Sequence, residues 1–524
     1  MHYTYLCTST SLVKRAIVMS LAATFLSSQA SANASLAATT ADIETIEVLG
    51  QINSLMIESE IDLTASSSPD LRAQLTQLPS VSINSNGPVT GIVQYRGLYS
   101  DRVQVSVDNQ LIAGAGPNSM DSPLSHVIGN VSQQVSLYQG IAPVSAGAET
   151  IGGAMDISEA MPFYTSSHAY EVNGALNLGH FSNNSDNVSA IVQAVNQSQY
   201  IALSADSQSG DSLKAGNGIT IPNTFYDRSA MKVRAGIQHN KHRVYVSVSS
   251  RNTDESGTPT LAMDIIFIDA LVSSLNYQYQ LSNTWQLKTS LAANNNEHDM
   301  NNFALRENNN PMSHRLNSVF SQGRSIGFGA LQTSNEWVNE YGIEARTRTQ
   351  NSRITNPNMA AFYLHNYRDV TRDIASVFGQ WQRNISGDTG LNNYQLGLRL
   401  SEVRASANNI DSNMAMMSPA VRSLRDAFND ADKDLDFSLI DMVAKSSFTL
   451  NDSLQMQLSA GIKEKAPGYF QLYSWFPLGI SAGLADGRNY LGNLSLEKET
   501  AHKLDLGFVM KGKNWRFMPN IFYT

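Results

Sequence analysis

Beyond about Tyr164 the chain repeats one pattern, in which apolar and polar residues alternate and Asn, Asp, Ser or Gly ends each stretch. Two clear examples run from Trp285 to Leu291 and from Tyr394 to Leu400. Neighbouring side chains of a β-strand point to opposite faces, so each stretch predicts a strand with one apolar and one polar face. Stretches of about ten residues recur roughly 16 times between Thr165 and Thr524, which predicts a large antiparallel sheet.

The preceding part of the chain, from about Asp42 to Pro162, follows a different pattern. Its Val- and Ile-rich segments are short and are separated by Gly and Pro, as in a small domain of mixed α and β structure. The alternating segment from Arg102 to Gln110 predicts a strand that leads into a turn. A short amphipathic helix is predicted between Pro69 and Pro79 by Leu71, Leu75 and Leu78.

Tight turns such as Leu281 to Thr284 alternate with long loops such as Arg404 to Met442. Two-faced strands joined in this way predict an antiparallel transmembrane β-barrel with a polar lumen. Aromatic residues near segment ends favour the barrel, because Trp and Tyr gather at membrane interfaces; these are Tyr170, Trp285, Trp381, Tyr394 and Trp515. A soluble sandwich or a large secreted solenoid would also alternate and remains the alternative. The predicted fold class is therefore an all-β transmembrane barrel with an N-terminal α+β domain.

The N-terminus carries the features of a secretory signal. Lys14 and Arg15 precede an apolar stretch from Ala16 to Leu26, and Ala30-Ser31-Ala32 supplies a cleavage pattern of small residues. An anchor helix would need about 20 apolar residues, so residues 1–32 are predicted to be a signal peptide. Its removal also removes Cys7, the single cysteine of the chain. The mature protein would then have no disulfide and no thiolate ligand.

Composition narrows the class of protein further. The 524 residues carry a net charge of -9, with 15% charged and 42% hydrophobic residues, which excludes a basic nucleic-acid binder and a disordered tail. The long apolar run lies at the N-terminus, so a multi-helix membrane protein is excluded as well. The sequence contains no phosphate loop and no His-Glu-x-x-His motif. These absences predict that the protein is not an enzyme.

Several motifs, in order along the chain, resemble the TonB-dependent outer-membrane receptor family. Glu44, Thr45, Ile46, Glu47 and Val48 resemble the TonB box of that family. The N-terminal domain resembles its plug in five segments: Leu75–Val81, Gln94–Gly97, Arg102–Gln110, Gln134–Gly140 and Glu149–Gly153. The plug-motif residues are Arg96, Gly97, Arg102, Asp108, Gly140, Gly152 and Gly153. The barrel signature is matched by Ala466–Tyr469 with Leu472 and Tyr473, by Tyr490–Asn493 and by Leu496–Glu499.

The resemblance implies an outer-membrane transporter without a prosthetic group. Its expected parts are a TonB-box region at 42–48, a plug at 49–162 and a transmembrane barrel at 165–524. Since the family's barrels have about 22 strands, the chain is expected to be truncated at its C-terminus. Its expected partners are a periplasmic TonB-type protein, to which the box adds as a strand, outer-membrane lipid, and a metal or metal chelate, but no nucleic acid. We also expect Arg96 or Arg102 to pair with an acid of the barrel or plug, because buried charges need partners.

A narrower resemblance is to the copper-receptor branch of the family, through Gln94–Tyr99, Gly116–Asp121, Phe476–Ile480 and Gly483–Gly487. That branch pairs a Cys-x-x-x-Met in the plug with a His-x-Met in the barrel. Met120, His298 and Met300 match it, whereas Gly116 occupies the cysteine position. The resemblance therefore implies copper as the transported ligand, and thioether with imidazole suits a soft ion such as Cu(I).

Other interpretations of these residues remain open. Met120 could pack beneath a loop, and a siderophore or vitamin receptor would share every plug motif; an outer-membrane adhesin is the non-transporting alternative. The methionines of the long loop, Met414, Met416 and Met417, could pass on a soft metal but are interpreted as loop contacts. The acidic run from Asp430 to Asp434 resembles a calcium loop, but Leu435 stands where its glycine is needed. It is interpreted as a solvated loop.

Overall fold

The computed structural model describes residues 58–62, 71–76, 78–108, 110–112, 114, 116, 121–127, 133–138, 140–159, 164–385, 390–477 and 489–524. The predicted signal peptide, the TonB-box region and Met120 lie outside these residues. Among the helices within them, none is long and apolar enough to cross a membrane.

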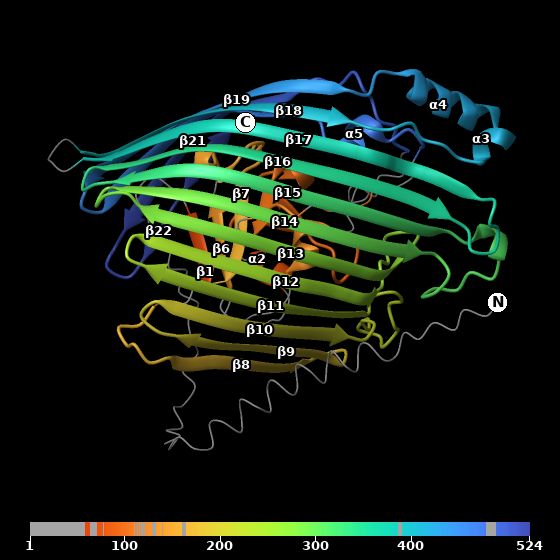
Figure 1. Cartoon of the computed structure of the whole chain (residues 1–524), viewed down its shortest axis with the longest axis horizontal. Coiled ribbons are helices and arrows are strands. Elements are labelled where there is room, and N and C mark those ends of the chain that lie inside the picture. The colour runs from red at the N-terminus through yellow and green to blue at the C-terminus, as the bar shows by residue number, and fades with distance from the viewer. Residues whose placement is uncertain are drawn as a thin grey trace, which may run out of the picture.

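One antiparallel sheet of 16 strands accounts for most of the chain after residue 170. It begins at β8 (Glu171–Phe181), and each strand pairs with its sequence neighbour as far as β21 (Glu499–Lys511), on which β22 (Arg516–Phe517) and β23 (Asn520–Tyr523) both pair. In Figure 1 the sheet curves around the N-terminal strands, drawn in red and orange. The strands between β8 and β21 are β9 (Ser185–Val195), β10 (Gln199–Gly210), β11 (Tyr226–His239), β12 (His242–Ser256), β13 (Asp264–Gln280), β14 (Trp285–Asn301), β15 (Leu316–Thr333), β16 (Trp337–Thr355), β17 (Tyr363–Asn384), β18 (Leu391–Ser406), β19 (Leu435–Asn451) and β20 (Leu454–Lys465).

The two faces of the sheet are apolar outside and polar inside, as β18 shows. Leu396, Leu398 and Leu400 are exposed, whereas Gln395 and Arg399, which alternate with them, are buried. A soluble protein would bury the leucines, but a barrel in lipid presents them to the hydrocarbon and keeps polar groups in its lumen. The predicted alternation and the number of strands are thus confirmed.

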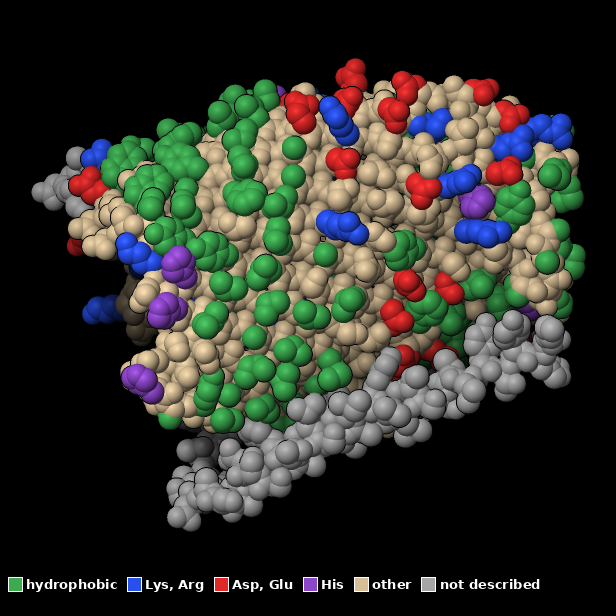
Figure 2. Space-filling view, viewed as in Figure 1, with side chains coloured by type: hydrophobic (Ala, Val, Ile, Leu, Met, Phe, Trp, Pro, Cys, Tyr) green, Lys and Arg blue, Asp and Glu red, His purple; other side chains and the backbone are tan. Residues whose placement is uncertain are grey.

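The strands are longer than the predicted ten residues, since β17 alone has 22. About 9–11 residues suffice to cross a bilayer, so the excess extends beyond the lipid. In Figure 2 apolar side chains gather toward the end of the sheet with short turns, and charged side chains toward the end with long loops. Aromatic rings also gather at the short-turn end, where Trp285 stacks on Tyr341 and Trp337 contacts Tyr394. This arrangement is the predicted aromatic belt.

The long loop between β18 and β19 is shorter than predicted and contains two helices. They are α3 (Met414–Met417) and α4 (Pro419–Asp430), so the loop spans residues 407–434. Met416 and Met417 are 74% and 76% exposed. A third helix, α5 (Tyr469–Tyr473), lies in the loop after β20.

The N-terminal domain, which we call the plug, contains two small sheets. The first has the order β1-β6-β7-β5, and the second the order β2-β3-β4. The strands are β1 (Glu58–Asp62), β2 (Val81–Asn84), β3 (Ile92–Tyr95), β4 (Leu98–Tyr99), β5 (Gln104–Val107), β6 (Gln133–Tyr138) and β7 (Ala154–Glu159). The predicted helix is α2 (Leu71–Leu75), and its leucines pack on Val105, Val135 and Ile157 in the main core. Three 3-10 turns, η2 (Ser100–Arg102), η3 (Pro123–His126) and η4 (Val144–Ala146), join these elements.

Candidate functional site

The two barrel residues of the predicted site lie on the inward face of β14. Asn294, Asn296, His298 and Met300 are buried, whereas Asn295 and Glu297 between them are exposed. This alternation directs His298 and Met300 toward the plug from successive inward positions. The spacing His-x-Met therefore places an imidazole and a thioether on the same side of one strand.

The ring nitrogens of His298 have no partner in the described part of the chain. Its side chain is fully buried, and within the described residues neither ring nitrogen has a hydrogen-bond partner. Met300 packs in a cluster with Leu261, Ile265 and Ile268. Because unpaired buried polar atoms are costly and therefore uncommon, His298 requires an explanation other than packing.

The plug loop that carries Gly116 is held by side chains from the barrel and its loops. The carbonyl of Gly114 accepts hydrogen bonds from Arg348 Nη2 and Gln350 Nε2, both at 2.5 Å. The Tyr469 hydroxyl, on α5, donates to the carbonyl of Gly116. Gly116 is buried and has a φ of 77°, a left-handed conformation that suits glycine. The position that matches the family's cysteine is therefore fixed in place but occupied by a residue without a side chain.

Asp121 connects this loop to β14 and to a second buried histidine. Its carboxylate accepts a hydrogen bond from Asn296 Nδ2, two residues before His298. Its backbone bonds to the ring of His126, at the end of η3. His126 is 2% exposed, and its Nε2 has no partner within the described residues. We call Asp121, His126, Asn296 and His298 the apex group.

His126 was not among the residues predicted from the sequence. It is the single histidine between residues 33 and 167, which is the signal that could have identified it. Burial, together with the nearby Arg251 and His298, lowers the pKa of His126 to about 3, so the ring is neutral.

Ligand chemistry restricts which metal the apex could hold. Within the described residues no three His, Cys, Asp or Glu side chains form a metal-binding group. The residues expected to bind a metal here, His298 and Met300, offer imidazole and thioether, which suit soft ions better than hard ones. Met300 is available for that role, and Met120 lies outside the described residues.

Ion pairs fasten the plug to the barrel at several other places. Arg96 Nη1 lies 2.7 Å from Asp505 Oδ1, and Arg102 forms two hydrogen bonds of 2.8 Å to Glu499. Both acids are on β21, so the predicted pairing is confirmed for both arginines. Gly140, at a φ of 76°, lies against the Asp505 carboxylate, where a larger residue would collide.

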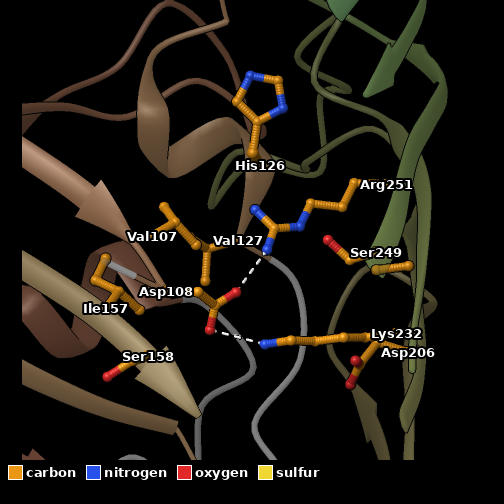
Figure 3. Close-up of a pocket in the computed structure, with 11 residues that line it drawn as sticks. Val107, Asp108, His126, Val127, Ile157, Ser158, Asp206, Lys232, Ser249 and Arg251 are labelled. Carbon is orange, nitrogen blue, oxygen red and sulfur yellow. Dashed lines mark hydrogen bonds and ion pairs between the residues drawn. The ribbon is translucent and has the colours of Figure 1, made fainter. Parts of the chain in front are cut away.

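Asp108 forms a third set of ion pairs between plug and barrel, shown in Figure 3. Its carboxylate lies 2.7 Å from Lys232 Nζ on β11 and 3.0 Å from Arg251 Nη2 on β12. In Figure 3 the ring of His126 points away from this ion cluster. The cavity between these residues, about 30 Å³, has room for little more than water.

Glu149 forms a fourth set of ion pairs between plug and barrel. We call Glu149, Arg346 and Arg372 the Glu149 cluster. Its carboxylate contacts Arg346 Nη2 at 3.2 Å and Arg372 Nη1 at 2.7 Å, and it accepts a hydrogen bond of 3.2 Å from the Ala466 backbone. Burial raises the pKa of Glu149, but the nearby cations, Arg372 first among them, lower it to about 2. Between this cluster and the apex loop lies a cavity of about 560 Å³, lined by plug and barrel residues that include Asp121 and Glu149.

Comparison with known proteins now identifies the family. A family profile described as TonB dependent receptor-like, beta-barrel matches residues 170–524. The chain belongs to the TonB-dependent receptor family. A search of curated proteins found no match.

Solved structures agree with this assignment in their fold. The copper transporter OprC superposes with a TM-score of 0.74 at 16% identity, over 89% of this chain and 71% of that one. The Serratia marcescens hemophore receptor HasR, in complex with its hemophore HasA and heme, superposes with a TM-score of 0.66 at 16% identity, over 89% and 72%. The FrpB iron transporter from Neisseria meningitidis superposes with a TM-score of 0.62 at 14% identity, over 89% and 72%.

Family and fold together establish the general role. The protein is a TonB-dependent transporter of the outer membrane, and the curved sheet of its barrel region packs around the N-terminal domain. The soluble sandwich and the solenoid are thereby excluded, and the family consists of transporters and not of enzymes. Its members are energised through a TonB protein and carry a ligand inward.

Proposed function

We propose that this TonB-dependent transporter takes up copper, and that His298 and Met300, together with Met120 of the plug, bind the ion. The observation that carries the proposal is the fully buried His298, whose two ring nitrogens have no partner within the described residues. Imidazole and thioether are ligands for Cu(I), whereas Fe(III) prefers oxygen. The similarity in fold to the copper transporter OprC supports the same choice.

The route of transport follows from the parts of the molecule. Copper binds at the plug apex, on the side of the long loops, while the plug blocks the lumen. The segment Glu44 to Val48 then pairs as an added strand with a periplasmic TonB-type protein, which supplies the energy to move the plug. Ile46→Pro removes a backbone donor and should stop uptake while copper still binds. Uptake unchanged by this substitution would contradict the coupling.

The ligand assignment is tested by copper accumulation in cells that depend on this transporter. His298→Ala and Met300→Ala should each reduce accumulation, because each removes a ligand. Met416→Ala is the matched control, since it removes an exposed methionine of the long loop. If all three variants accumulate copper like the unaltered protein, His298 and Met300 are packing residues.

A second candidate ligand is a ferric chelate, and the cavity of about 560 Å³ favours it. A volume of this size is typical of small-molecule sites. Against it, Arg346 and Arg372 in the cavity wall are already paired with Glu149, which leaves less positive charge for an anionic chelate. Adding excess ferric citrate or ferric siderophore should leave copper uptake unchanged; strong competition would favour the chelate.

A further inference from the structure

His126 has one ring nitrogen in use and one unoccupied. The ring bonds to the backbone of Asp121, and since Nε2 has no partner within the described residues we assign this bond to Nδ1 and the Asp121 carbonyl. A ring nitrogen that bonds a backbone carbonyl carries the proton. His126 is therefore the tautomer whose Nε2 presents a bare lone pair.

This tautomer is the one that binds metals. A metal-bound histidine typically donates its second ring N–H to a carbonyl or carboxylate, which fixes the ring and leaves the other nitrogen for the metal. His126 shows the same arrangement toward Asp121. The ring is also 2% exposed, so water from the surface does not explain the unpaired nitrogen.

His126 and His298 lie close together although they are far apart in the sequence. Asp121 bonds to His126 on one side and to Asn296 on the other, and Asn296 precedes His298 by one inward position on β14. The charge of a protonated His298 would also be felt at His126. Two buried imidazoles, each with a nitrogen that has no partner among the described residues, thus lie near each other where plug and barrel meet.

We propose that His126 is a copper ligand and supplies, from the plug, the group that Gly116 lacks. The inference rests on the proposed function and adds one residue to it. The resulting set contains two neutral imidazoles and the thioether of Met300, which is a ligand set for Cu(I). The buried Asp121 carboxylate beside the site provides the negative charge that the missing thiolate would have supplied.

One nearby charge opposes a cation at this place. Arg251 lies close enough to affect His126, but its guanidinium is paired with Asp108 at 3.0 Å. Figure 3 shows the ring of His126 turned away from that pair. The Asp108 carboxylate therefore offsets the charge of Arg251, and the ring faces a different side.

The inference is tested with the purified full-length protein in detergent, titrated with Cu(I) under reducing conditions against a chromophoric competitor. His126→Ala should weaken binding by at least about 100-fold, because losing a ligand costs more than losing an outer partner. His126→Met should recover part of the affinity, since it restores a soft ligand. His180→Ala, which alters an exposed histidine, should bind like the unaltered protein.

X-ray absorption of the copper complex provides a readout that does not depend on folding of the variants. Two imidazoles should be counted in the unaltered protein and one in His126→Met. A single imidazole in the unaltered protein would overturn the assignment of His126. If His298→Ala loses copper and His126→Ala does not, the inference fails and the proposed function stands. If the unaltered protein binds no copper, the proposed function fails and the inference fails with it.

Discussion

Two buried contacts between plug and barrel differ in how completely their polar groups are paired. In the Glu149 cluster a single carboxylate meets two arginines and a backbone N–H, so its charge is paired, although Arg372 Nε has no partner among the described residues. In the apex group His126 and His298 retain ring nitrogens without partners in the described part of the chain. A paired buried charge holds two parts of a protein together, whereas an unpaired buried nitrogen is suited to a ligand that arrives later.

Glu149 and, from the apex group, Asp121 line the same cavity of about 560 Å³, so the difference does not arise from opposite places in the molecule. It arises from the kind of side chain. Carboxylate and guanidinium are charged and must be paired when buried, but imidazole can remain neutral and leave a lone pair unoccupied. The Glu149 cluster should therefore determine how firmly the plug is held, and the apex group what the plug binds.

The largest effect is expected from Glu149→Gln. The substitution removes the carboxylate charge with which Arg346 and Arg372 pair; because both guanidinium groups are only half-buried, the cost should lie at the low end of that for a broken buried pair, on the order of 3 kcal/mol. The free energy of plug opening should fall by that amount. It can be measured through thiol labelling of a single buried cysteine introduced as Ala142→Cys, because the predicted mature chain has no other cysteine.

The control is the double variant Glu149→Gln with Arg372→Ala, which removes one of the stranded charges and should recover part of the loss. Equal labelling of the Glu149→Gln variant and its parent would mean that this cluster does not hold the plug.

The second prediction uses pH in place of mutation. The pKa of Glu149 is lowered from 4.5 to about 2 in the folded protein. The unfolded carboxyl titrates near its ordinary value, so the stabilisation is complete above pH 4.5 and is lost as the pH falls toward 2. The loss is on the order of 3 kcal/mol. Labelling of the cysteine in Ala142→Cys should accelerate across this window with an acid-tolerant reagent, and the acceleration should be weaker in Glu149→Gln.

More of the barrel than of the candidate metal site could be predicted from the sequence. Alternation in segments such as Tyr394 to Leu400 reports directly which face meets lipid, so strand number and orientation could be predicted. The length of the strands could not be predicted. Where a strand extends beyond the lipid, its outer face meets water, so apolar residues are no longer required there and the alternation ends. The half of β14 that leads into the long loop illustrates this, since Asn294, Asn295 and Asn296 carry no alternation although the strand continues.

The site was predictable only where residues stand close in the sequence. His298 and Met300 share a face because they are two apart on a strand, and Arg96 and Arg102 needed partners because they are charged. His126 comes near His298 through Asp121, which bonds to Asn296 on β14, and no spacing in the sequence reports that link. The fixed tautomer of His126 is likewise set by a backbone carbonyl that folding brings to it.

A smaller effect of opposite sign is expected from His298→Leu. In the absence of metal the imidazole gains no hydrogen bond within the described residues, so an apolar side chain of similar size should relieve its desolvation cost. The free energy of unfolding should rise by about 2 kcal/mol, measured by denaturation in detergent, while copper binding is lost. His298→Gln, which keeps a buried polar group, should show no such gain. A loss of stability in His298→Leu as large as that in Glu149→Gln would remove the distinction between the two contacts.

The smallest effect concerns Gly116, where a thiol can be added to the apex group. A residue with a side chain at a φ of 77° is strained by about 1 kcal/mol, and this cost applies equally to Gly116→Cys and Gly116→Ala. The alanine variant is therefore the matched control. Any difference in Cu(I) affinity between the two variants is due to the sulfur atom. In Cu(I) titrations Gly116→Cys should bind more tightly than the unaltered protein, because a thiolate adds an anionic soft ligand, and Gly116→Ala should not. Equal affinity in the two variants would mean that position 116 does not face the metal, which would leave His126 as the plug's ligand in the described residues.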